Sequence, residues 1–170
     1  MLSVRVISFA ALGLALSGLT AVAVSGQELI TQKAVPVEMA LTIAQGAMER
    51  CRADGFHVSV SVIDRSGLLK AFLRDESTGP HTIDLSRRKA FTALTFANRY
   101  ATSGEAAKAW NSTLGSPMPN VDGAVGVAGG VPIKIGNDTI GAVGVSGALG
   151  GDKDEACAKA GIAKIADKLK

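Results

Sequence analysis

The pattern of apolar and polar positions predicts one helix near the start of the chain and another at its end. Between Pro36 and Asp54 apolar residues recur at three- and four-residue intervals, and Gly55 follows as a helix stop. In the closing segment, Asp152 or Asp154 can cap a helix. Its apolar positions, again at helical spacing, are Ile162, Ile165, Ala166 and Leu169.

Alternation of apolar and polar residues predicts a β-hairpin directly after the first helix. In FHVSVSVID, residues 56–64, valines alternate with His57 and two serines, which is typical of a strand with one buried face. We therefore expect His57 to be a half-exposed residue in the middle of a strand. The turn DRSG, residues 64–67, and the run LLKAFLRD, residues 68–75, complete the hairpin.

The second half of the chain predicts two helices and another hairpin. Thr82 is a candidate N-cap for a helix reaching about Asn98, and a shorter helix ends near Trp110. A long loop follows at residues 111–123. Residues 123–147 read as two strands, and their frequent glycines indicate that the backbone packs closely against a neighbour.

This order of elements favours one α+β domain, an antiparallel β-sheet flanked by α-helices. Residues 1–26 stand apart from it: a short basic start, an uncharged apolar run and small residues ending at Gly26. They are typical of a signal peptide, which leaves a mature domain at 27–170. The alternative is a retained membrane anchor, because roughly 20 apolar residues span a bilayer. We expect a periplasmic or secreted protein with no stable membrane insertion after cleavage.

Composition narrows the classes of partner. The net charge is +3, with acidic and basic residues interleaved, so nucleic acid is not an expected partner. Aromatic residues make up only 4% of the chain, so small and branched aliphatic side chains must build the core. In an exported protein, Cys51 and Cys157 are expected to form a disulfide, and the alternative is two buried thiols.

Motifs of common enzymes and metal sites are missing from the sequence. His57 and His81 are the only histidines, and the chain has no GxSxG, HExxH or CxxC motif. The glycine-rich runs lack the lysine and Ser/Thr of a phosphate-binding loop. The sequence therefore nominates no catalytic residue.

One helix face suggests a flat ligand with an acidic edge. Leu85, Lys89, Thr92 and Phe96 share a stripe by their spacing, and His81 lies just before that helix. Haem would suit this stripe, because its propionates bind Arg or Lys and its iron binds His or another donor. The alternative is an ordinary amphipathic helix with its cations in solvent.

Three stretches of the chain resemble the GlcG/HbpS-like haem-binding (haem-degrading) family. They are RDESTGPHTIDLSRRKAFTA, AGGVPIKIGNDTIGAVGVSGA and GGDKDEACAKAGI, and the similarity runs from about residue 35 to residue 168. The resemblance implies a three-layer, profilin-like fold with helices on both sides of an antiparallel sheet. It further implies a haem-binding protein that forms homo-oligomers and communicates with a sensor protein.

The resemblance also implies site residues. Thr92 matches a threonine that binds haem iron in one member, and His81 is the second candidate iron ligand. Arg88 and Lys89 are then expected near the propionates. Two alternatives stay open: a corrinoid in place of haem, and an enzyme or accessory factor acting on haem, a corrinoid or a small glycolate-like acid. The expected role is haem capture, storage or redox sensing.

Overall fold

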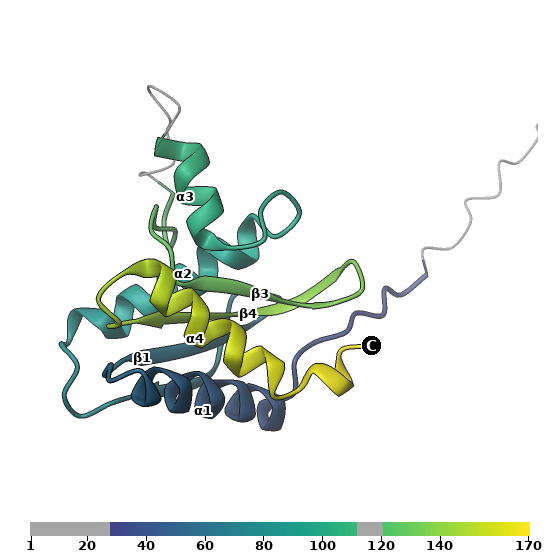
Figure 1. Cartoon of the computed structure of the whole chain (residues 1–170). Helices are drawn as coiled ribbons and strands as arrows, with labels where there is room; N and C mark the ends of the chain where they lie inside the picture. Colours follow the sequence, from purple (N-terminus) through teal and green to yellow (C-terminus); the bar gives the residue numbers. More distant parts are fainter. Residues whose placement is uncertain (1–27, 112–120) are drawn as a thin grey trace, which may run out of the picture. The chain divides into compact units, whose positions relative to one another are not determined.

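Four antiparallel strands form the centre of the molecule in a computed structural model that describes residues 28–111 and 121–170 (Figure 1). The predicted signal peptide and most of the long loop after residue 111 lie outside these residues. The strands are β1 (Ser59–Asp64), β2 (Leu69–Arg74), β3 (Gly130–Ile135) and β4 (Asp138–Ser146). Their order in the sheet is β2-β1-β4-β3, so two hairpins join along β1 and β4.

Two helices cover one face of this sheet. They are α1 (Val37–Ala53) and α4 (Gly151–Ala163), which is followed by the short η2 (Ala166–Lys168). They approach so closely that a Cβ atom on Gly161 would collide with the backbone carbonyl of Ile43. The predicted disulfide is present at this interface, with the Cα atoms of Cys51 and Cys157 5.5 Å apart.

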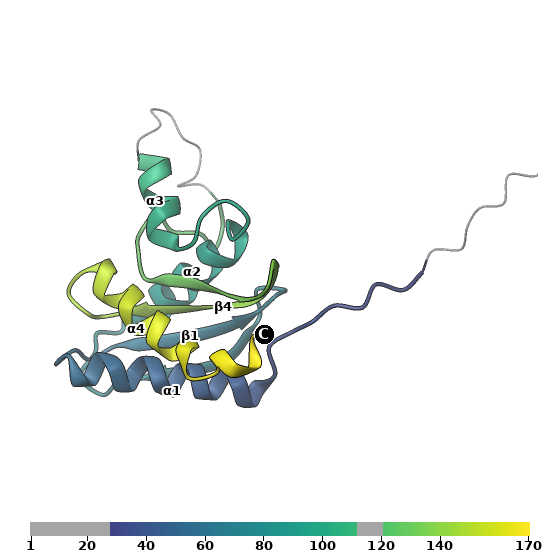
Figure 2. The same cartoon turned by 45° about the vertical axis from the view of Figure 1, so that its right-hand side comes forward.

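The opposite face carries α2 (His81–Thr95), with α3 (Ser103–Asn111) beside it, so the fold has three layers (Figure 2). Glycines of the second hairpin allow this contact: Gly144 packs against the carbonyl of Ser86, and Gly130 packs against the carbonyl of Lys89. Neither position has room for a Cβ atom, which confirms the predicted close approach. The predicted α+β class is confirmed as well.

The prediction that β1 has one buried face is wrong. Both faces are buried, because α2 covers the side that carries the serines. The Ser59 hydroxyl lies 2.8 Å from the Thr82 hydroxyl, and Ser61 lies 2.8 Å from Ser86. Paired hydroxyls satisfy each other's hydrogen bonds, so polar residues can be buried at the centre of the sheet.

Three local predictions also need correction. His57 is not in mid-strand but precedes β1. Pro80, not Thr82, occupies the N-cap of α2, and the Thr82 hydroxyl donates a hydrogen bond to the Gly79 carbonyl at 2.6 Å. Helix α4 begins after Gly150 without a side-chain cap, which leaves its acidic residues available for other contacts.

None of the helices in residues 28–111 and 121–170 has the length and hydropathy needed to span a bilayer.

Candidate functional site

A cavity of about 1060 Å³ opens at the end of the sheet where β1 begins and β4 ends. Its walls come from the segments before β1 and before β3, the first half of α2, one side of α3, the loop after β4 and the first half of α4. We call it the main cavity; the lining side chains used below are Phe56, His57, His81, Leu85, Lys89, Lys108, Val127, Ala128, Asp154, Glu155 and Lys159. Its size is at the upper end of the range of small-molecule sites.

A buried ion pair lies in the wall of the main cavity. The Lys89 ammonium on α2 is 2.6 Å from Oδ2 of Asp154 on α4, and each side chain is only 5% exposed. The other carboxylate oxygen accepts a hydrogen bond from the Ala148 backbone amide at 3.0 Å. Burial raises the pKa of Asp154 above its ordinary value, although the adjacent Lys89 charge opposes this change. The pair links the two helical layers around the end of the sheet.

The structure brings together two of the four predicted ligand-binding residues. His81, the first residue of α2, and Lys89, two turns further on, both line the main cavity. The His81 ring folds back over Gly79, where an added Cβ atom would lie 2.9 Å from it. The predicted ligand roles of His81 and Lys89 remain predictions.

Arg88 and Thr92 lie on α2 but do not line the main cavity. Arg88 donates a hydrogen bond from Nη2 to the Ala124 carbonyl at 2.8 Å. The fully buried Thr92 hydroxyl accepts one from the Val125 amide at 2.8 Å and donates one to the Val125 carbonyl at 3.1 Å. In the structure both side chains therefore hold the segment that precedes β3, and their ligand roles also remain predictions.

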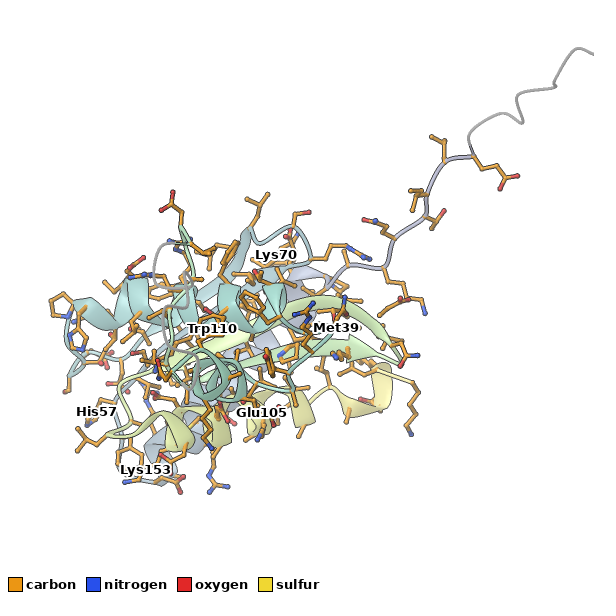
Figure 3. The ribbon with its side chains drawn as sticks, turned by 90° about the horizontal axis from the view of Figure 1, so that it is seen from above. Met39, His57, Lys70, Glu105, Trp110 and Lys153 are labelled. Atoms are coloured by element: carbon orange, nitrogen blue, oxygen red, sulfur yellow. A yellow bond between two sulfur atoms is a disulfide. The ribbon has the colours of Figure 1, made fainter. Side chains whose placement is uncertain are left out.

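His57 also belongs to the site, although the sequence did not predict it as a site residue. Its side chain is 54% exposed and lines the main cavity, and its Nδ1 atom lies 3.0 Å from Oδ1 of Asp75. Asp75 is 4% exposed, and its other oxygen accepts a hydrogen bond from Nε of Arg52 at 2.7 Å. Phe56, the residue before His57, has the Lys153 ammonium 4.9 Å from the centre of its ring, and Figure 3 labels His57 and Lys153.

The charge of Asp75 determines how the His57 ring is protonated. The bond from Arg52 lowers the pKa of Asp75 from 3.8 to about 2, assisted by His57 and the Ser77 amide and opposed by burial. Asp75 is therefore ionised at neutral pH and can only accept hydrogen bonds. Nδ1 of His57 must carry the proton in this hydrogen bond, which leaves Nε2 as the ring nitrogen that Asp75 does not occupy.

We expect the Asp75 cluster to make stability depend on pH in the acid range. Because the folded pKa of Asp75 is depressed, its contribution is present above pH 3.8 and is lost as pH falls towards about 2. Asp75→Asn should lower the free energy of unfolding at neutral pH, and its difference from wild type should shrink across that interval in urea titrations. Glu76→Gln is the matched control, because Glu76 also faces Arg52, at 3.8 Å, but is 88% exposed. Equal pH profiles for the two variants would contradict the prediction.

Comparison with known proteins supports the resemblance seen in the sequence. The family described as haem degrading protein, HbpS-like, matches residues 35–163. A crystal structure of HbpS is 36% identical with a TM-score of 0.75, and covers 84% of this chain and 97% of its own. A double mutant of Streptomyces reticuli HbpS is 37% identical with the same TM-score, and covers 84% and 94%.

More distant matches share the fold. The crystal structure of a PduOC:heme complex is 22% identical with a TM-score of 0.69, and covers 78% of this chain and 95% of its own. No curated protein sequence matches the chain. Because the family match extends over most of the chain and HbpS exceeds one third identity, the chain belongs to the HbpS-like family of haem-degrading proteins.

Proposed function

We propose that this protein is an exported haem-binding protein that acts in haem capture, storage or redox sensing. The observation that carries the proposal is the main cavity, about 1060 Å³ in volume, with the His81 imidazole in its wall. Membership of the HbpS-like family supports a haem-related role, and the solved haem complex of PduOC shows that a distant protein of this fold binds haem. The sequence features of residues 1–26 support export.

The side chains of the main cavity fit the chemical groups of haem. Imidazole is a common axial ligand of haem iron. Leu85, Val127 and Ala128 offer apolar surface for the porphyrin faces. Lys108 on α3 and Lys159 on α4 provide cations near which propionates can lie, although Lys159 also lies 4.0 Å from Glu155.

The four residues predicted from the sequence differ in which of their present contacts they would have to give up to bind haem. His81 can supply a ring nitrogen to iron in the main cavity directly. Thr92 would first have to release its two hydrogen bonds to Val125. Lys89 would have to share its ammonium between Asp154 and a propionate, and Arg88 would have to turn away from Ala124.

Haemin titration of the purified protein tests the proposal. We expect a Soret band to form in the wild type, and we expect His81→Ala and Thr92→Ala to shift its position, because each removes a proposed iron ligand. Arg88→Ala should weaken affinity about tenfold to a hundredfold, the effect of losing one charge-assisted bond of roughly 1.5 to 3 kcal/mol. The control is Arg87→Ala, because the neighbouring Arg87 does not line the main cavity and bonds to the exposed Asp84. A wild type that forms no Soret band would overturn the proposal.

The buried pair of Lys89 and Asp154 favours a second candidate function. An ammonium next to a carboxylate of raised pKa can hold or transfer a proton at a bound acid. An enzyme or accessory factor acting on haem, a corrinoid or a small glycolate-like acid would use this feature. Binding of a corrinoid in an absorbance titration, or of glycolate by calorimetry, without binding of haemin would favour this candidate.

A homo-oligomer and a sensor-protein partner are also part of the proposal, and they rest on the resemblance alone.

A further inference from the structure

We infer that His57 binds haem iron through Nε2 from the wall of the main cavity, and that Asp75 and Arg52 are the positioning residues behind it. This inference rests on the proposed function and adds to it an iron ligand outside the stretches that carry the family resemblance. It concerns Arg52 and His57, which lie close together in sequence, and Asp75, which is 18 residues after His57 and meets both at one end of the sheet.

The first argument is the direction in which the His57 ring is held. Its Nδ1 atom is fixed at 3.0 Å by a carboxylate that is itself nearly inaccessible to solvent. Metal-binding histidines usually donate their second ring N–H to a carboxylate or carbonyl, which fixes the tautomer and makes the free nitrogen a better donor. His57 has this arrangement in advance, with Nε2 as the nitrogen available to a ligand.

The second argument is that the support behind the ring is rigid. The Asp75 amide donates a hydrogen bond to the Val58 carbonyl at 3.0 Å, so the register of the first hairpin holds the carboxylate beside the His57 side chain. On the other side, Gly147 lies at φ +131°, and an added Cβ atom there would collide with the His57 carbonyl. The backbone on both sides of His57 is therefore constrained before any ligand binds.

The third argument is that other groups already compensate the buried charge of Asp75 without His57. Arg52 at 2.7 Å already compensates the charge, and the Ser77 amide gives a further, longer contact at 3.5 Å. A histidine serving only to satisfy Asp75 would have no reason to line the main cavity with more than half of its side chain exposed. A ligand function accounts for both the exposure and the anchoring.

Haemin binding to the full protein tests the inference with His57→Ala. We expect the Soret band to shift because an iron ligand is lost, and affinity to fall at least as far as the roughly tenfold to hundredfold caused by losing only the partner behind a metal-binding histidine. Added imidazole should restore the wild-type band, since a free imidazole can occupy the vacated position. Circular dichroism verifies folding, which an exposed side chain before β1 should not affect.

Asp75→Asn tests the positioning role separately. It should keep a histidine-bound spectrum but weaken haemin binding about tenfold, the usual effect of losing the partner behind a metal-binding histidine. Glu76→Gln, the exposed neighbour, should bind like wild type. In the ligand-free protein, ¹⁵N NMR should find His57 protonated at Nδ1, and Asp75→Asn should increase the Nε2-protonated tautomer.

The outcomes distinguish this inference from the proposed function. If wild type binds haemin and His57→Ala keeps its spectrum and affinity, the inference is wrong and haem binding stands. If wild type forms no Soret band, the proposed function and the inference both fall. A His57 ring protonated at Nε2 in the ligand-free wild type would also overturn the inference, whatever the haemin result.

Discussion

Reduction of the Cys51–Cys157 disulfide is expected to lower the free energy of unfolding by about 4 to 5 kcal/mol. The bond joins residues 106 positions apart, and in the chain-entropy model a loop of about 100 residues contributes about 4.7 kcal/mol by restricting the unfolded chain. Since small domains are stable by only about 5 to 15 kcal/mol, the reduced protein should be close to unfolding. Urea unfolding with and without reductant measures the difference.

A variant without the bond controls for the reductant itself. Cys51→Ala with Cys157→Ala should unfold at the same urea concentration in both conditions. Both sulfur atoms lie in the main core, where α1 contacts α4, so the variant also loses packing and should be no more stable than the reduced wild type. A wild type that loses less than about 1 kcal/mol on reduction would contradict the entropic estimate.

The helices and strands could be predicted from the sequence because their signals are local. Apolar spacing located α1, and the turn residues 64–67 located the first hairpin close to its observed position. Burial of both faces of β1 could not be predicted in this way. Ser59 and Ser61 resemble solvent-facing residues, and only their pairing with Thr82 and Ser86 on a distant helix makes their burial favourable.

The site was harder to predict for the same physical reason. Lys89 and Asp154 are 65 residues apart, and His57 and Asp75 are 18 apart, so neither pair is visible as a motif. The register of the first hairpin held a usable signal, because pairing Ser59 with Arg74 brings the residues before β1 next to Asp75. The register shifts by one residue between Ile63, which pairs with Leu69, and Val62, which pairs with Ala71. Counting pairs outward from the turn without this shift would place the residues before β1 one position away from their observed partners. In addition, the alternation of apolar and polar residues made His57 resemble an ordinary strand residue, so its hydrogen bond with Asp75 was not predicted.

Loss of the Lys89 ammonium is expected to destabilise the fold by about 3 to 5 kcal/mol. Lys89→Met keeps much of the side-chain volume but leaves the Asp154 carboxylate buried, with the Ala148 amide as its remaining hydrogen-bond donor among residues 28–111 and 121–170. An unpaired buried charge carries a penalty of this size. Lys159→Met is the matched control: this lysine also pairs with an acid of α4 but is exposed, so its replacement should cost no more than about 1 kcal/mol.

The variant should also respond to pH in a defined direction. Burial already raises the pKa of Asp154, and removing Lys89 removes the charge that opposes this rise. A raised folded pKa means that the penalty is present while the carboxyl is ionised and is relieved as pH falls through that pKa. The difference between Lys89→Met and wild type should therefore shrink as pH is lowered from about 8 to about 4, the side on which carboxyl groups take up protons.

A second replacement separates the penalty of the unpaired charge from the value of the pair. Lys89→Met combined with Asp154→Leu removes both charges, and apolar replacement of a buried pair is often neutral or stabilising. We expect the double variant to recover most of the stability lost in Lys89→Met and to lose the pH response, as measured by urea unfolding. If Lys89→Met is no less stable than Lys159→Met, Asp154 finds another partner or water in the main cavity, and the pair does not fix α2 to α4.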